Sequence, residues 1–328
     1  MDIKTKMNHK FRDLQGGLFL NVSKADVGEG ASVFQKAGGD VMAWADMFYP
    51  DPSIPESGKK ATMEAVSGGF PSHYTLPVGM YELRQAIAEH VSERIGRPID
   101  PSRNVIVNPG SDNGLLFSMM PFICEGDEIL IPDPSYPSNY LNCKLLDGVP
   151  VPVPTYPEDN YRIRIEEMEK RGTPKTKMVL LTHPNNPTTV VYRKDNLQEL
   201  ADFIIKHDLI LVCDQAFEDH IFDGIEFVSP CTLPGMWERT VTGVKMKMSE
   251  SGILSWLDIS ALGTSQEVAD YLLEHAKIMV NQGTPYGAQG EGHIRIVTAC
   301  FAKDEDALIR FERIKASLTE LAKTKGLL

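Results

Sequence analysis

Short apolar segments alternate with helix-like segments through the middle of this 328-residue chain, and this alternation constrains its fold more than any other feature. A helix is expected at Asn196–His207, where apolar side chains recur at helical spacing. Segments that are apolar throughout and separated by helices are typical of a parallel sheet buried on both faces. We therefore expect a three-layer α/β domain with a mostly parallel sheet. Its strands are expected at residues 104–109, 128–133, 149–153 (an edge strand, because of its prolines), 177–184 and 208–215.

The character of the chain differs before and after this region. Residues 1–60 carry scattered glycine and proline and predict an irregular N-terminal arm. Residues 61–242 then form the large domain, which opens with a helix at 80–96. Residues 243–328 predict a smaller α+β domain, with strands at 244–248, 252–260 and 292–301.

Two helices are expected in this smaller domain. The first follows a capping box made by Thr264 and Glu267. The second spans residues 305–323, and its spacing predicts a buried face of Leu308, Phe311, Leu318 and Leu321.

Composition narrows the range of partners. The formal net charge of −12 argues against nucleic acid, because phosphate backbones require basic surfaces. The N-terminus lacks the apolar core of a signal peptide, and no apolar run approaches the ~18 residues of a membrane span, so we expect a soluble, cytoplasmic protein with no membrane partner. The five cysteines show no metal-binding spacing, which predicts reduced thiols and no metal site.

Polar residues follow the predicted strands, where an open α/β sheet binds its ligands. The turn at 109–114 enters a helix and could hold an anion on backbone N–H groups, although many such turns are only turns. Tyr136 and Asn186 follow two further strands, with a packing tyrosine and a structural loop as the alternatives. Asp214 ends an apolar strand, so its carboxylate needs a cation or strong donor nearby.

Six segments of the chain form an ordered set of motifs, at residues 74–87, 109–115, 133–137, 183–188, 214–217 and 290–296. In this order they resemble class I/II aminotransferases, which are pyridoxal-phosphate-dependent enzymes of fold type I. The resemblance implies pyridoxal 5′-phosphate as cofactor, an amino acid and a 2-oxo acid as substrates, transfer of an amino group between them, and a homodimer.

The resemblance also implies roles for residues that bind the cofactor. The turn formed by Gly110, Ser111 and Asp112 would hold its phosphate. Tyr136 would stack on the pyridine ring, and Asn186 would form a hydrogen bond with the phenolic oxygen.

Three further roles follow from the same resemblance. Asp214 would pair with the protonated pyridine nitrogen, which keeps the ring an electron sink. Arg295 would bind the α-carboxylate of the substrate through its two-pronged guanidinium. Tyr74 would reach the phosphate site of the neighbouring subunit.

The chain departs from the family pattern at two single positions. Thr189 stands where the family usually has glycine, and Phe217 stands where it usually has tyrosine. Phenylalanine cannot donate a hydrogen bond to the phenolic oxygen of the cofactor, so the electronic properties of the pyridine ring would be tuned less well.

A larger departure follows Thr242, where the family continues into the segment with the Schiff-base lysine. Here Gly243 comes next and the pattern of the small domain begins, so roughly 80–100 residues of the family pattern are absent and no catalytic lysine is identified. Lys245 and Lys247 fit better as solvent-facing lysines of a strand, and Lys24 lies in the arm.

Three alternatives to an active enzyme stay open on these grounds. The chain could be a non-catalytic relative that binds pyridoxal phosphate or an amino acid, or an internally deleted, inactive product. A nucleotide-binding module built on the turn at Gly110 is disfavoured, since neither GxGxxG nor GxxxxGK[ST] occurs.

Overall fold

The computed structural model describes residues 6–12, 29–43, 54–243, 254–298, 301 and 303–328. The strand expected at 244–248 lies outside these residues, as do Lys24, Lys245 and Lys247.

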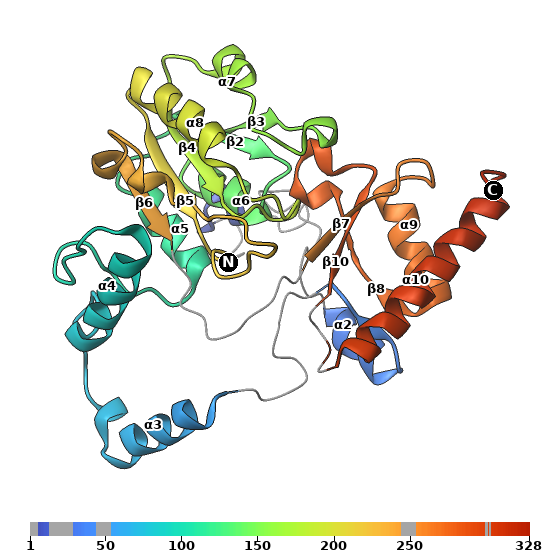
Figure 1. The fold of residues 1–328 in the computed structure, drawn as a ribbon, viewed down its shortest axis with the longest axis horizontal. Helices are drawn as coiled ribbons and strands as arrows, with labels where there is room; N and C mark the ends of the chain where they lie inside the picture. Colours follow the sequence, from blue (N-terminus) through green and yellow to red (C-terminus); the bar gives the residue numbers. More distant parts are fainter. Residues whose placement is uncertain (1–5, 13–28, 44–53, 244–253, 299–300, 302) are drawn as a thin grey trace.

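A five-stranded parallel sheet forms the centre of the large domain, with the order β3-β2-β4-β5-β6 (Figure 1). The sheet confirms four of the expected strands and puts the proline-containing β3 at an edge. The strands are β2 Glu128–Asp133, β3 Val149–Pro154, β4 Thr176–Thr182, β5 Ile210–Asp214 and β6 Thr240–Gly243.

Helices cover both faces of this sheet, which confirms the three-layer α/β fold. On one face, α5 (Ser111–Met119) and α6 (Pro137–Leu145) pack on alternate strand residues such as Ile129 and Leu180. On the other face, α7 (Ile165–Arg171) and α8 (Lys194–Lys206) enclose the intervening residues, such as Val179. Since successive strand side chains point to opposite faces, a strand apolar throughout can serve both cores.

The prediction of a strand at residues 104–109 is wrong. In the structure this segment is irregular and joins no sheet, and Ile106 is 65% exposed. Its backbone bonds elsewhere, because Val107 N donates to Val78 O at 3.1 Å. The segment therefore lies against the chain that enters α4 (Tyr81–Ile95) and not along the sheet.

The C-terminal region forms a second core around an antiparallel sheet of order β7-β10-β9. The expected capping box is present, since Glu267 N donates to Thr264 Oγ1 and Thr264 N donates to Glu267 Oε2. Strand β10 lies centrally in this sheet. The elements are β7 Leu254–Asp258, α9 Ser265–Tyr271, a π-helix at Leu272–Ala276, β8 Ile278–Met279, β9 Asn281–Gln282, β10 His293–Val297 and α10 Asp304–Thr324.

One expectation for α10 is wrong. Leu308 is 62% exposed, because the face of α10 that packs on this core begins one turn later, at Phe311 and Ile314. Leu318 and Leu321 lie on the packed face, as expected.

The N-terminal region is more regular than the sequence suggested. It contains α1 (His9–Arg12), α2 (Glu29–Lys36) and β1 (Asp40–Val41), and β1 pairs in parallel with β8. Met42 is fully buried in the C-terminal core. Helix α3 (Glu56–Ser67) buries no residue and extends with α4 away from the sheet (Figure 1). The domain boundaries drawn from the sequence stay a prediction.

Within the described residues, no helix combines the length and the apolar character needed to cross a membrane.

Candidate functional site

The carboxyl ends of the parallel strands lie side by side at one edge of the sheet. Thr182 at the end of β4 pairs with Asp214 at the end of β5, and Asp214 pairs with Gly243 at the end of β6. The pairing continues beyond the strands, because His183 N donates to Asp214 O and Gln215 N donates to Gly243 O, both at 2.8 Å. The residues that follow these strands therefore leave the sheet on the same side.

Asp214 is buried at this edge, with 5% of its surface exposed. Its Oδ1 accepts a hydrogen bond from Ala216 N at 3.1 Å. The sequence predicted a desolvated carboxylate at the end of an apolar strand, and the structure places one there. Its role toward a cofactor stays a prediction.

Arg295 and Asn186, both predicted site residues, are in contact. Arg295 lies on β10, is 1% exposed, and donates from Nη1 to Asn186 Oδ1 at 3.3 Å. Its Nε and Nη2 donate to Asn281 Oδ1 at 3.1 and 2.7 Å, and Nη2 also donates to Ala43 O at 2.8 Å. The contact joins the end of β4 in the large domain to the small domain. Since a guanidinium only donates, the carbonyl of Asn186 must face it, and the amide Nδ2 is directed elsewhere.

The turn before α5 lies beside Tyr136. Gly110 has a φ of 95°, and no atom lies within 4 Å of the position that a Cβ would take. Ser111 begins α5, so the backbone N–H groups of the first turn of this nine-residue helix lie next to Gly110. Tyr136 Oη donates to Asp112 Oδ2 at 3.4 Å, which brings the predicted stacking residue to the predicted phosphate turn.

Tyr74 is not part of this arrangement. Its side chain is fully exposed on the segment between η2 (Phe70–Ser72) and α4. Its predicted role concerns a second subunit, and it stays a prediction.

The two single departures from the family pattern occupy different environments. Thr189 is exposed and has a φ of 64°, in the left-handed region that favours glycine. Phe217 is half-buried after β5, with its ring edge-on to His220 at 5.9 Å between centroids.

Sequence reasoning missed Asp133, which ends β2 as Asp214 ends β5. Asp133 is 2% exposed. Burial raises its pKa to about 6, although hydrogen bonds from the backbone N–H groups of Gln289 and Ala288 act in the opposite direction. An acid at the end of an apolar strand was the pattern that singled out Asp214, and the same pattern would have found Asp133.

A second cluster of charged groups lies where α4 meets the loop after β5. Arg94 forms ion pairs with Glu218, at 3.2 Å, and with Asp219. His90 brings a ring nitrogen to these carboxylates, and the three potential ligand atoms lie within 4.8 Å of one another. Burial raises the pKa of Glu218 to about 7, against the lowering effect of Arg94. Arg94 pairs with both carboxylates, so the cluster is an ion-pair network that joins α4 to the loop after β5.

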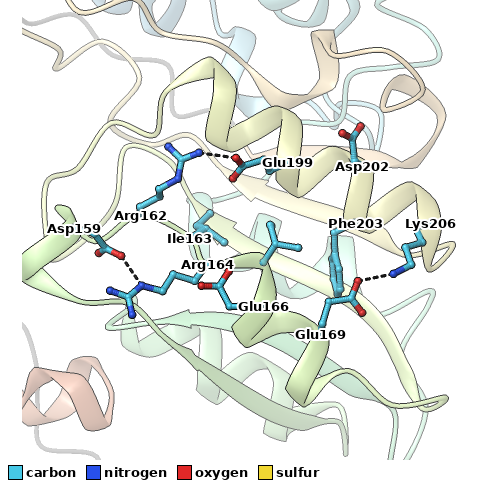
Figure 2. A pocket seen from close by; sticks show the side chains of 11 residues that line it. Asp159, Arg162, Ile163, Arg164, Glu166, Glu169, Glu199, Asp202, Phe203 and Lys206 are labelled. Atoms are coloured by element: carbon cyan, nitrogen blue, oxygen red, sulfur yellow. Dashed lines mark hydrogen bonds and ion pairs between the residues drawn. The ribbon is translucent and has the colours of Figure 1, made fainter.

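A groove of about 580 Å³ lies between the 159–169 segment and α8 (Figure 2). None of the predicted site residues lines it. Ion pairs engage most of its charged side chains, namely Arg164–Asp159, Arg162–Glu199 and Lys206–Glu169.

Known proteins support the resemblance. An aromatic-amino-acid aminotransferase of Thermococcus litoralis is 38% identical over 193 residues, which cover 59% of this chain and 49% of the relative. An aspartate aminotransferase of Pyrococcus abyssi is 28% identical over 348 aligned positions, covering 81% of this chain and 89% of the relative. That aligned length exceeds the 328 residues of this chain, so the relative carries residues with no counterpart here. The chain spans about half the length of several other curated relatives.

Solved structures share the fold. An aromatic aminotransferase from Pyrococcus horikoshii superimposes with a TM-score of 0.79 at 25% identity, covering 90% of this chain and 100% of the other. A structure described as Pyrococcus protein-A1 gives 0.80 at 25% identity, covering 95% and 100%.

The family model described as aminotransferase class I and II matches this chain in two segments, residues 40–240 and 234–310. Together these segments take in most of the sequence. The chain therefore belongs to the class I and II aminotransferases, a family whose members use pyridoxal phosphate.

Proposed function

We propose that this chain binds pyridoxal phosphate without a covalent lysine linkage, together with the carboxylate of an amino acid or a 2-oxo acid. One observation carries the proposal: buried Arg295 of the small domain is held against Asn186 at the carboxyl edge of the sheet. This contact leaves the chain with a carboxylate-binding group beside its predicted cofactor-binding residues.

The side chains at the strand ends fit the cofactor chemically. When bound, pyridoxal phosphate supplies a conjugated ring that withdraws electrons from the α-carbon of an amino acid. Asp214 is a buried carboxylate, suited to hold a proton on the ring nitrogen. The N-terminus of α5 offers backbone N–H groups to a phosphate, and the exposed Gly110 leaves room for it to approach.

Two further residues complete this set. Asn186 turns its carbonyl to Arg295, so its Nδ2 is the group left to donate to an oxygen on the ring. Tyr136 is half-buried next to the phosphate turn and offers an aromatic face.

Arg295 would bind the substrate carboxylate. Its guanidinium is fixed by Asn281 and by Ala43 O, so little rotational freedom is lost when a carboxylate binds. A planar guanidinium matches the two oxygens of a carboxylate, which selects amino acids and 2-oxo acids as a class. The side chain of the substrate is not predicted.

The missing lysine separates binding from catalysis. A base that moves the proton at the substrate α-carbon is required for transamination, and the sequence identifies no such residue. A loss of residues after Thr242 is supported by the two-segment family match and by the unmatched residues of the Pyrococcus abyssi relative. We therefore expect no transamination above the rate of the free cofactor.

The proposal is tested by equilibrium dialysis of the purified chain against pyridoxal phosphate, with borohydride trapping and peptide mapping in parallel. We expect reversible binding that weakens about tenfold or more in Asp214→Ala, because a charge-assisted hydrogen bond is lost, and that is unchanged in the exposed control Asp202→Ala. We expect no absorbance band of lysine-linked cofactor.

Three results would contradict the proposal. A borohydride-stable adduct on Lys245 or Lys247 would show that a lysine binds the cofactor covalently. Transamination far above the free-cofactor rate would show that the chain is catalytically active. If the chain shows no cofactor binding that Asp214→Ala weakens, the internally deleted, inactive product is left as the explanation.

Under the same proposal the chain is a cytoplasmic homodimer whose ligands are small molecules, with no nucleic-acid or membrane partner. The acidic net charge of −12 supports the exclusion of nucleic acid. Exposed apolar side chains in residues 54–122 support a second subunit.

A further inference from the structure

Asp133 joins two segments that are far apart in the sequence. Its Oδ2 accepts a hydrogen bond from Ala288 N at 3.0 Å, and Gln289 N lies 3.4 Å from each carboxylate oxygen. Ala288 follows Asp133 by 155 positions and belongs to the turn that precedes β10. The carboxylate at the end of β2 therefore contacts the small domain directly.

The backbone reinforces this contact. Ser135 N donates to Tyr286 O at 2.7 Å, so the chain after β2 and the 284–290 turn are joined at two points. Gly287, within the 284–290 turn, has a φ of 119°, and a Cβ at this position would clash with Asp133 Oδ1. The close approach of the turn to the carboxylate thus depends on a glycine.

The same turn supports Arg295. Tyr286 is fully buried, and the Arg295 guanidinium lies 5.2 Å from the centre of its ring. The ring of Trp256, on β7 beside β10, meets Tyr286 edge-on at 5.7 Å. A shift of the turn would move Tyr286, and with it one wall of the Arg295 site.

A buried carboxylate is costly unless its environment compensates, so its retention calls for a reason. Here two backbone N–H groups of the turn and the hydroxyl of Tyr140, on α6, provide the compensation. Removal of the carboxylate would leave those donors without their acceptor in a partly buried position.

We propose that Asp133 is a positioning residue, which ties the 284–290 turn to the end of β2 and thereby sets Arg295 relative to Asp214. This inference rests on the proposed function, in which Arg295 binds the substrate carboxylate. Asp133 acts through the turn and does not touch the substrate.

The experiment uses the full chain with saturating pyridoxal phosphate and compares Asp133→Ala, Asp133→Asn and the exposed control Asp202→Asn. Hydrogen exchange of the Ala288 and Gln289 amides measures the contact between Asp133 and the 284–290 turn, which we call the tether. Calorimetric titration with 2-oxoglutarate measures ligand affinity at the Arg295 site. We expect Asp133→Ala to speed exchange at both amides and to weaken 2-oxoglutarate about tenfold. Asp133→Asn keeps a carbonyl acceptor and should recover affinity to within about threefold of the wild type.

A background of Arg295→Ala separates positioning from a general loss of stability. In that background Asp133→Ala should cause no further loss of affinity, because the group that it positions is gone. Gly287→Ala disturbs the same contact from the other side and should reproduce the effects of Asp133→Ala, which keeps the test available if that variant does not fold.

Unchanged exchange at Ala288 and Gln289 in the Asp133→Ala and Gly287→Ala variants would overturn the tether. Faster exchange with unchanged 2-oxoglutarate affinity would overturn the positioning role. A wild-type chain that binds pyridoxal phosphate but shows no Arg295-dependent binding of 2-oxoglutarate would refute the substrate half of the proposed function, while the exchange rates would still decide the tether.

Discussion

At residue 189 the backbone adopts a conformation that suits glycine, yet the chain carries threonine with a φ of 64°. The left-handed region costs a β-branched residue about 1–2 kcal/mol, and glycine avoids this cost. Glycine also makes the unfolded chain more flexible, which offsets part of the stabilisation. Thr189→Gly should therefore raise the free energy of unfolding by about 1 kcal/mol in urea denaturation. Thr189→Ala keeps the unfavourable φ and should change stability little. A glycine variant no more stable than the alanine variant would contradict this explanation.

Glu218 should make the protein less stable as the pH rises. Burial raises its pKa from 4.5 to about 7, so the folded state binds a proton that the unfolded state releases. The stabilisation that the protonated Glu218 gives the folded state is full below pH ~4.5 and is lost as the pH rises through about 7.

Glu218→Gln should remove this dependence. Between pH 6 and 8 the wild type should lose about 1 kcal/mol relative to this variant, measured by urea denaturation at each pH. This range lies above most of the titration of Asp133, whose pKa is about 6. Glu166→Gln, at a groove position, serves as the control and should keep the wild-type slope. A wild-type slope in Glu218→Gln would refute the assignment.

Among the elements, α9 depends on the reciprocal capping box between Thr264 and Glu267. Thr264→Ala leaves the N–H of Glu267 without its acceptor and should lower the free energy of unfolding by about 1 kcal/mol. Thr319→Ala, in the middle of α10, removes only a bond from a hydroxyl to the carbonyl of the preceding turn and should cost less. Equal losses in the two variants would show that the cap contributes nothing beyond an ordinary hydroxyl.

Elements were predictable where one local pattern determines them. Apolar runs located β2, β4 and β5, because a strand buried on both faces needs apolar residues throughout. Segment 104–109 has the same pattern but joins no sheet, since strand pairing depends on a neighbouring edge that the segment itself does not encode. Leu308 has helical spacing with the α10 core residues, yet the packed face begins one turn later.

In the candidate site, too, local patterns were predictable from the sequence, and contacts between distant segments were not. The positions of Asp214 and Asn186 could be predicted because Asp214 ends a strand and Asn186 follows one, and strand ends meet at one edge of a parallel sheet. The link from Asp133 to Ala288 spans 155 positions and uses backbone N–H groups, which every residue except proline offers. No residue type marks such a contact, so it became visible only in three dimensions.

At the scale of the whole molecule, large apolar side chains are exposed mainly along residues 54–122. Phe117, Met120 and Phe122 are 47%, 50% and 40% exposed on and just after α5, whose other side packs on the sheet. A monomer rarely leaves large contiguous apolar patches in contact with water. The exposed side of α5 is therefore a surface suited to bury against a second copy.

The double variant Phe117→Ser/Met120→Ser should shift the chain from dimer to monomer in sedimentation velocity. Because each side chain is only about half exposed, its removal takes roughly 1 kcal/mol of burial from each subunit. A symmetric dimer carries each change twice, which is enough to weaken association by more than about a hundredfold. Phe222→Ser is the matched control, since Phe222 is 50% exposed but lies in the segment after β5 and not on α5. It should leave the dimer intact. A wild-type chain that sediments as a monomer at micromolar concentration would refute the dimer, and a double variant that stays dimeric would place the interface elsewhere.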